Sequence, residues 1–262
     1  MGGGTVPVLG AGRPASPLTR LAEASMPRVP RVLVFAFVAG GLVWACGAPA
    51  PTPDSRSAFP APGRPVAPVV SPGRGLEEER DRVGEAEGVM DRLGVRPGMR
   101  VADVGAGEGY YTVRLARRLG PGATIYAQDI NPAYLDRLRA RLARELVEGV
   151  VVILGTPGDP KLPAASVDLA LLAHVYHEIE NPFELLHRLH LSLRPGGRVA
   201  IIEVDKPTEH HGTPPALLRC ELAAVGYRQV DLGSLAPADG YLAVFVPPEV
   251  LPPVASIAPC RP

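Results

Sequence analysis

The sequence predicts an α/β protein with a parallel, doubly wound sheet. Short apolar runs alternate with segments of helical periodicity along the central part of the chain, and this alternation is typical of parallel strands whose connecting helices cover both faces of the sheet. Two Asn-Pro pairs mark helix starts between the apolar runs, and a glycine-rich turn follows the first run. These three observations together define the expected fold class.

Seven strands are expected from the apolar runs. Five of them alternate with helices, at residues 100–104, 123–128, 150–154, 167–173 and 198–204. Two more, at residues 227–232 and 241–246, follow a helix expected at 214–225 and have no helix between them. Consecutive strands without a crossover are naturally antiparallel neighbours, so we expect the sheet to end in an antiparallel pair.

Two of the expected helices begin at Asn131-Pro132 and Asn181-Pro182, where an N-cap residue precedes proline at the first helical position. Each then carries an apolar stripe at helical spacing. The stripes are Leu135, Leu138, Leu142 and Leu146 in the first helix, and Phe183, Leu186, Leu189 and Leu193 in the second. The second helix is expected to end at the Pro-Gly-Gly sequence of residues 195–197.

The N-terminal part of the chain has the pattern of an export leader. Residues 1–46 are interpreted as an irregular start followed by a basic head after Met26, an apolar run and the sequence Ala45-Cys46. This end resembles the lipobox of bacterial lipoproteins, in which the cysteine, here Cys46, carries the lipid. The alternative is an uncleaved anchor helix over residues 32–51. Either interpretation places the rest of the chain outside the cytoplasm, at the membrane of the cell envelope; without a functional leader the protein is cytoplasmic.

Composition divides the remaining chain into three parts. Residues 47–75 are rich in proline and alanine and are expected to form a stiff, extended linker. Residues 76–247 form the folded domain, and residues 248–262 form a tail. Outside the leader the cysteines are Cys220 and Cys260, and in an exported domain these two could pair.

The charge of the chain argues for a small-molecule partner. Lysine plus arginine and aspartate plus glutamate each number 27, so no overall field attracts nucleic acid or an acidic membrane surface. No basic stripe interleaved with aromatic residues is present either. We therefore expect no nucleic-acid partner, and membrane contact only through the N-terminal anchor.

The glycine-rich turn contains Gly105, Gly107 and Gly109. Glycines between a strand and a helix let a ligand approach the backbone closely. The dinucleotide pattern needs its third glycine one residue later, where this chain has Tyr110, and this difference argues against a pyrophosphate. Asp129 ends the next strand, where its carboxylate could accept hydrogen bonds from a ribose diol. A nucleoside without phosphates fits both features.

Four successive motifs resemble those of class I S-adenosylmethionine-dependent methyltransferases. They read VADVGAGEGYYTVRLA, IYAQDINPAYLDRL, SVDLALLAHVYHEIENPFELLHRL and LRPGGRVAIIE. The resemblance covers residues 76–247 and implies S-adenosylmethionine as cofactor. It also implies a Rossmann-like, seven-stranded sheet with strand order 3-2-1-4-5-7-6, in which the last strand is antiparallel.

The resemblance also assigns cofactor-binding residues. Asp103 corresponds to the acid that orients the methionine amino group, and the three glycines correspond to the loop beside the methionine part. Asp129 corresponds to the ribose acid, with Ile130 packing on the adenine. After the third strand the family places an acid near the adenine amine; here Thr156 occupies that position and Asp159 follows later.

The end of the fourth strand supplies the catalytic candidates. It reads His174-Val175-Tyr176-His177-Glu178, and histidine can take a proton near neutral pH. We assign His177 as the candidate general base and His174 as a catalytic candidate that contacts cofactor or substrate, while a purely structural role remains open for both. A metal site joining them to His210 and His211 is not favoured, because nothing fixes the separation of these four residues, and no metal is expected.

The predicted function is in-line methyl transfer from S-adenosylmethionine to a small-molecule acceptor. Arsenite methylation is disfavoured because it uses several thiols, whereas this chain has only Cys220 and Cys260 outside the leader. The main alternative is a catalytically inactive adenosyl-binding module on the same fold, which the export leader favours because the cofactor is made in the cytosol. A nicotinamide-dependent oxidoreductase is a third reading, against which the glycine spacing argues.

Overall fold

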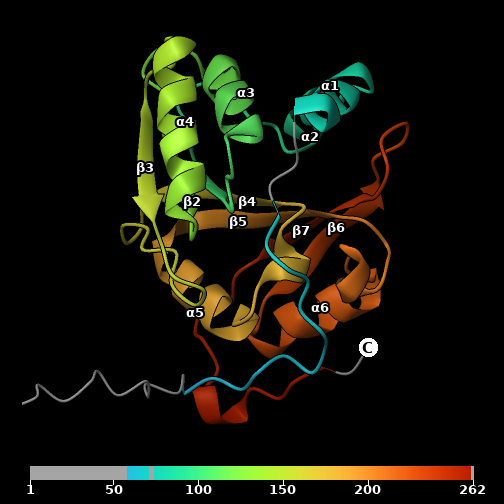
Figure 1. Ribbon diagram of the computed structural model, residues 1–262. Helices are drawn as coiled ribbons and strands as arrows, with labels where there is room; N and C mark the ends of the chain where they lie inside the picture. The colour runs from blue at the N-terminus through green and yellow to red at the C-terminus, as the bar shows by residue number, and fades with distance from the viewer. Residues whose placement is uncertain (1–57, 71–73, 261–262) are drawn as a thin grey trace, which may run out of the picture. The chain divides into compact units, whose positions relative to one another are not determined.

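The computed structural model describes residues 58–70 and 74–260, and their central feature is a seven-stranded sheet (Figure 1). The strand order is β3-β2-β1-β4-β5-β7-β6. The first five strands in this order are parallel, and β7 is antiparallel to both β5 and β6. The predicted fold class and strand order are confirmed. The leader, with Cys46, lies outside the described residues.

The strands follow the predicted apolar runs closely. Their bounds are β1 Arg100–Val104, β2 Thr124–Asp129, β3 Val150–Leu154, β4 Val167–Ala173, β5 Leu193–Glu203, β6 Arg228–Ser234 and β7 Tyr241–Val246. The largest difference is at β5, which begins at Leu193 and includes the Pro-Gly-Gly sequence expected to precede it. The pairing register of β4 with β5 shifts beside that sequence, between Val167 and Leu169.

The helices cover both faces of the sheet (Figure 1). Their bounds are α1 Arg74–Arg82, α2 Glu85–Arg92, α3 Tyr110–Leu119, α4 Pro132–Arg144, α5 Pro182–Ser192 and α6 Pro215–Ala224, with short 3₁₀ helices η1 Tyr176–Glu178, η2 Thr208–His210 and η3 Val254–Ser256.

Both Asn-Pro pairs do begin helices, but only one asparagine caps its helix through the side chain. Asn131 accepts a hydrogen bond from the backbone N–H of Ala133 at 3.0 Å, whereas the Asn181 side chain makes no such bond. The prediction that Leu146 extends the apolar stripe of α4 is wrong. The helix ends at Arg144, and Leu146 has a left-handed backbone and is 87% exposed.

Alternate side chains of the central strands enter separate cores on the two faces of the sheet. Ala102 and Val104 of β1 pack in the core that contains Phe183 of α5. Val101, which directly precedes Ala102 and points to the other face, packs in the core that contains Val89 of α2 and Leu115 of α3. This period of two is what a central strand buried on both faces requires. A third, smaller core packs α4 on β2.

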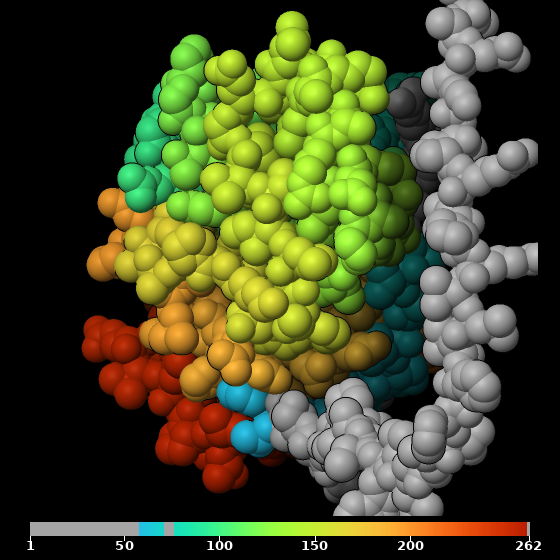
Figure 2. All heavy atoms as spheres, turned by 60° about the vertical axis from the view of Figure 1, so that its left-hand side comes forward, coloured from blue at the N-terminus to red at the C-terminus, as the bar shows by residue number. Residues whose placement is uncertain are grey.

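Residues 58–70, here called the strap, run along the domain in extended conformation and contact several elements. The Arg64 guanidinium is buried and donates to both carboxylate oxygens of Glu221 in α6, at 3.0 and 3.2 Å. It also donates to the backbone carbonyls of Tyr176 and His177. The linker prediction did not include these contacts. In Figure 2 the first described residues, in blue, lie against the C-terminal segment, in red.

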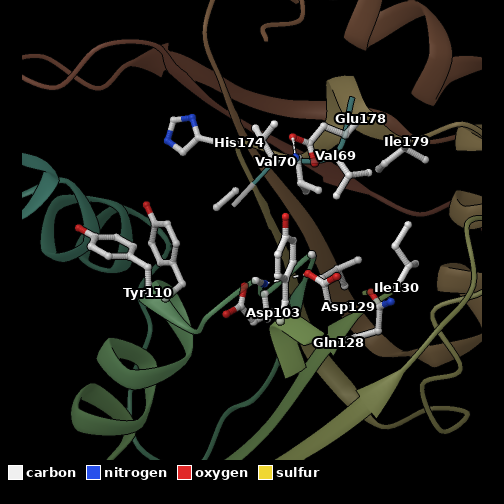
Figure 3. A pocket seen from close by; sticks show the side chains of 18 of the residues that line it. Val69, Val70, Asp103, Tyr110, Gln128, Asp129, Ile130, His174, Glu178 and Ile179 are labelled. Carbon is white, nitrogen blue, oxygen red and sulfur yellow. Dashed lines mark hydrogen bonds between the residues drawn. The ribbon is translucent and has the colours of Figure 1, made fainter. Parts of the chain in front are cut away.

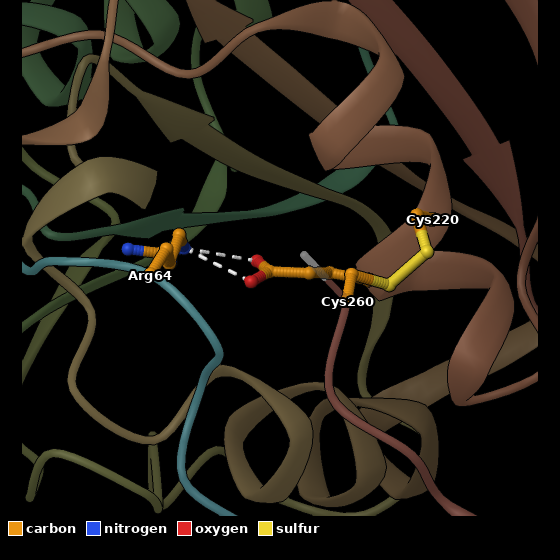
Figure 4. Close-up of a disulfide and its surroundings, with 4 residues drawn as sticks. Arg64, Cys220 and Cys260 are labelled. Carbon is orange, nitrogen blue, oxygen red and sulfur yellow. Dashed lines mark hydrogen bonds and ion pairs between the residues drawn. A yellow bond between two sulfur atoms is a disulfide. The ribbon is translucent and has the colours of Figure 1, made fainter. Parts of the chain in front are cut away.

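A disulfide between Cys220 of α6 and Cys260 fixes the C-terminal segment beside the strap (Figure 4). A Cβ atom added at Gly63 of the strap would lie only 2.3 Å from the carbonyl oxygen of Cys260, so the two segments are in direct backbone contact. Cys220 also precedes Glu221, the partner of Arg64. The cysteine pairing that an exported domain permits is therefore present.

None of the described helices is long and apolar enough to cross a membrane.

We expect the disulfide to contribute substantially to stability, because it closes a loop with a sequence separation of 40. Cross-linking a loop of this length lowers the entropy of the unfolded chain, and the double variant Cys220→Ser/Cys260→Ser should lose about 4 kcal/mol of unfolding free energy. Urea unfolding of the wild type and the variant, with and without reductant, measures this loss of unfolding free energy. Reductant should lower the midpoint of the wild type and leave that of the variant unchanged; equal midpoints in all four experiments would contradict the prediction.

Candidate functional site

A pocket lies at the carboxyl ends of β1, β2 and β4, where the order of the strands along the chain reverses between β1 and β4. This is the position at which open α/β sheets bind ligands. The glycine turn, the start of α3, the turn after β4 and the end of the strap complete its walls. Figure 3 shows the labelled side chains, with Asp103 and Asp129 on one side of the pocket and His174 and Glu178 on the other.

Asp129 at the end of β2 is nearly buried and is held by backbone donors. One carboxylate oxygen accepts the N–H of Gly107 and the other accepts the N–H of Asn131, both at 2.8 Å. Burial raises the pKa of Asp129, although these backbone hydrogen bonds oppose the rise. A carboxylate has about four acceptor positions, so Asp129 keeps acceptor capacity for a ligand hydroxyl beside its backbone bonds from Gly107, Ile130 and Asn131.

Asp103 at the end of β1 is the second buried carboxyl group of this wall. Its partner is the Thr112 hydroxyl of α3, which donates to it at 2.6 Å. Burial raises the pKa of Asp103 to about 6 against the effect of this bond, and the negative charge of Asp129 raises it further. A ligand cation at this position would restore the ionised form.

The glycine turn forms part of the same wall. Gly105 and Gly107 line the pocket, and both have positive φ values, of 74° and 54°. A Cβ atom at Gly105 would lie 2.6 Å from Cγ2 of Val175, in the turn after β4. Glycine is therefore required at this position both for its backbone conformation and for the close approach of the two turns.

His174 stands on the opposite wall, immediately after β4. Its backbone is left-handed, with φ of 54°, a conformation that is uncommon for residues other than glycine and ends the strand. Its Nε2 lies 3.2 Å from Oε1 of Glu85 in α2. Burial tends to raise the pKa of Glu85, but the hydrogen bonds with His174 and Arg80 hold it at about 2, so Glu85 is an ionised partner for the imidazole.

Glu178 connects the strap to the pocket. It lies in η1, lines the pocket, and its Oε1 accepts the backbone N–H of Val70 at 3.0 Å. Val69 and Val70 line the pocket beside it. Burial raises the pKa of Glu178 to about 7, and the bond from Val70 and the nearby His177 only partly oppose this. The strap therefore forms part of the ligand-facing surface.

The structure brings most of the predicted site residues together, but not all of them. Those at the pocket are Asp103, Gly105, Gly107, Asp129, Ile130 and His174. Those outside its lining are Gly109, Thr156, Asp159 and His177. Thr156 and Asp159 pair with each other through their backbones, and Pro157 between them reaches the pocket instead. The ring of His177 points to Glu203, with Nδ1 2.9 Å from its Oε2.

Sequence reasoning missed several residues of the pocket. Glu178 ends the sequence His174–Glu178 that supplied the catalytic candidates, and this carboxyl group beside two histidines is a signal that could have been used. Arg80 of α1 lies over the ring of Tyr110, with the guanidinium carbon 4.0 Å from the ring centroid, and its position in a charged helix gives no such signal. Val69 and Val70 belong to a segment interpreted as linker.

The residues present fit an adenosyl ligand that carries a cationic amino acid group. Asp129 offers a carboxylate with remaining acceptor capacity for a ribose hydroxyl, and Asp103 offers a buried carboxyl group for an ammonium. Tyr110, 6% exposed at the start of α3, occupies the position where a dinucleotide fold needs a small residue for the pyrophosphate. The chemistry of the site thus favours S-adenosylmethionine over a dinucleotide.

Comparison with known proteins supports this assignment. Residues 102–201 match the family described as methyltransferase domain. Over these residues the chain is thus similar to a methyltransferase domain. The prediction of S-adenosylmethionine as its cofactor is confirmed at the level of this domain.

Named relatives of the methyltransferase domain share part of its sequence. An uncharacterized methyltransferase of Mycobacterium tuberculosis is 36% identical over 124 residues, which are 47% of this chain and 47% of that protein. A ubiquinone/menaquinone biosynthesis C-methyltransferase of Ectopseudomonas mendocina is 33% identical over 120 residues, 45% of this chain and 46% of that protein. The chain thus matches about half the length of these curated relatives.

The fold of the methyltransferase domain is also found among solved structures. A SAM-dependent methyltransferase from Aquifex aeolicus superposes with a TM-score of 0.59 at 21% identity, covering 67% of this chain and 97% of that one. At this identity the likeness shows the shared fold.

Gly105→Ala should weaken binding of S-adenosylmethionine at least tenfold, because the added Cβ forces the glycine turn and Val175 apart. Gly94→Ala is the matched control. Its φ of 64° is also positive, but a Cβ there meets no atom within 4 Å. Both variants should lose about 1 kcal/mol or more of stability from the positive φ. Titration calorimetry measures affinity; equal affinity in the two variants would contradict the prediction.

Binding of S-adenosylmethionine should weaken below pH 6, because the cationic amino group needs Asp103 ionised and the pKa of Asp103 is about 6. At pH 5 about one tenth of this group is ionised, so we expect about tenfold weaker binding than at pH 7.5. The raised pKa has the opposite effect on the free protein: the contribution of Asp103 to stability is fully present below its unfolded pKa and is lost as pH rises through about 6.

Calorimetry at pH 5 and pH 7.5 measures this dependence, and Asp103→Asn should abolish it. A variant that retains the full pH dependence would show that another group is responsible.

Proposed function

We propose that the protein transfers the methyl group of S-adenosylmethionine to a small, largely apolar acceptor. The observation that carries this proposal is the buried Asp129 carboxylate, which is held by backbone N–H groups at the pocket wall and keeps acceptor capacity for a ribose hydroxyl. No phosphate-binding feature accompanies it at the start of α3, since Tyr110 fills that place.

The apolar side chains around the pocket support a small organic acceptor. Val69, Val70, Ile179 and Leu185 line it, and such walls suit a ligand that is mostly buried when bound. The quinone-biosynthesis C-methyltransferases among the relatives act, by their names, on acceptors of this class. Reduced quinones that lack the ring methyl group are therefore the first acceptors to test.

The chain's own residues have two tasks in this reaction. When bound, S-adenosylmethionine supplies a methyl group already activated by the sulfonium, so the protein mainly positions the acceptor. His174 can hold the proton that the acceptor loses. When its Nε2–H donates to the ionised Glu85, Nδ1 is left as a proton acceptor at the pocket wall. His174 thus takes the role of candidate base that the sequence assigned first to His177.

We also propose that the domain works outside the cytoplasm, behind the leader that ends at Cys46. The Cys220–Cys260 disulfide supports this proposal, because disulfides form and persist mainly in oxidising compartments. Detection of a diacylglyceryl group on Cys46 by mass spectrometry distinguishes a lipid anchor from an uncleaved helix.

Asp129→Asn tests the proposed function directly. It should weaken S-adenosylmethionine binding about a hundredfold, because an amide accepts through one oxygen only and loses the charge-assisted bonds to the ribose. Asp136→Asn is the matched control on α4, where the aspartate is exposed and pairs with Arg139. Calorimetry should give micromolar affinity for the wild type and this control; tight NAD binding, or full affinity in Asp129→Asn, would overturn the assignment.

Transfer of labelled methyl to reduced quinones separates an enzyme from an inactive binding module. An enzyme incorporates label in the wild type and loses incorporation in Asp129→Asn. Tight cofactor binding without transfer to any small-molecule acceptor would support the module.

A further inference from the structure

A cluster of metal-ligating side chains lies next to the pocket, where the turns after β4 and β5 meet. His177 and Glu178 come from η1, and His211 directly follows η2. One ligand atom of each residue lies within 4.8 Å of the corresponding atoms of the other two. The structure thus brings together His177 and His211 of the four histidines weighed from the sequence, and adds Glu178.

Glu203 fixes the orientation of the His177 ring. This glutamate, at the end of β5, is fully buried, and its carboxylate oxygens lie 3.0 and 2.9 Å from Nδ1 of His177. A proton on Nδ1 is thereby favoured, and Nε2 is left with a free lone pair. Metal-binding histidines typically donate their second ring nitrogen to a carboxylate in this way, which sets the tautomer and raises ligand basicity.

The candidate ligand atoms of His177 and Glu178 lie close together but do not hydrogen-bond to each other. Nε2 of His177 is 3.8 Å from Oε1 of Glu178, beyond hydrogen-bonding distance. Within residues 58–70 and 74–260, no side-chain hydrogen bond holds the ring of His211, which stands perpendicular to that of His177 with centroids 5.3 Å apart. The exposed His211 can therefore rotate to bring the nitrogen and oxygen atoms to metal-binding distance.

Charge also favours a cation at this place. Glu178 and Glu203 are both buried, and in the described part of the chain neither forms an ion pair with lysine or arginine. The nearby guanidinium of Arg64 is paired with Glu221. Buried carboxyl groups without a cationic partner are costly to ionise. A divalent ion between them would supply the compensating positive charge.

We propose that His177, Glu178 and His211 bind a divalent transition-metal ion, with Glu203 as the residue that positions His177. Two imidazole nitrogens and one carboxylate oxygen suit Zn²⁺, Mn²⁺, Fe²⁺ or Co²⁺, and three protein ligands leave coordination positions open. Because Glu178 also lines the pocket, the ion lies at the wall opposite Asp103 and Asp129. On the proposed methyl-transfer function, it can bind an oxygen of the acceptor there.

Metal binding is tested on the untagged full chain after treatment with a chelator. Titration calorimetry with Zn²⁺, and the visible absorption of Co²⁺, should show one ion per chain with micromolar or tighter affinity. His211→Ala should weaken binding at least a hundredfold; His211 is exposed, so this variant should fold. His210→Ala is the matched control, because His210 is the neighbouring exposed histidine of the same turn and lies outside the cluster. It should bind as the wild type does.

Glu203→Gln provides a second test, since loss of the partner of a ligating histidine typically weakens binding ten- to a hundredfold. No stoichiometric binding, or equal affinities in His211→Ala and His210→Ala, would overturn the proposal. Asp129→Asn separates it from the proposed function. This variant should bind the metal normally while losing S-adenosylmethionine, so failure of one assignment leaves the other measurable.

Discussion

The reversal of strand order between β1 and β4 is the constraint on which the site depends. From β1 the chain adds β2 and β3 on one side, and it then returns to place β4 on the other. As a result, α3 after β1 and α5 after β4 pack into cores on opposite faces of the sheet. The turns that lead to these helices therefore diverge, and a crevice opens between them at the carboxyl ends of the strands. Asp103 and His174 face this crevice because each stands at the end of one of the two strands.

A second constraint comes from the two ends of the described chain, which hold each other in place. Arg64 is buried against Glu221, and the adjacent Cys220 bonds to Cys260. Gly63 permits the carbonyl of Cys260 to approach the strap. Since Val70 is only six residues beyond Arg64 in the same extended segment, this anchoring also determines where the strap meets Glu178. The disulfide thus supports one wall of the pocket from a distance, through covalent and backbone contacts.

The sequence predicted what local periodicity and end groups determine, and it failed where distant segments meet. The bounds of β1, β4 and β7 follow from apolar runs that are mostly buried, and those of β3 follow from an apolar run on an edge strand. The Asn131 cap follows from its own side-chain chemistry. Leu146 continues a helical pattern, but the helix stops before it. In the site, the end of a predicted strand located Asp129, and the family resemblance located Asp103. The contribution of the strap depends on tertiary contacts of a proline-rich segment, for which no periodicity exists.

The sequence His174–Glu178 shows how one motif can serve two sites. The left-handed backbone of His174 ends β4 and turns the chain into η1. His174 thereby faces Glu85 on the cofactor side, while His177, three residues later, faces Glu203 on the other. Glu178 lies between the two environments, in the pocket lining and in the cluster with His211. Two histidines of similar appearance in the sequence thus acquire different chemistry, because each meets a different buried glutamate from a distant part of the chain.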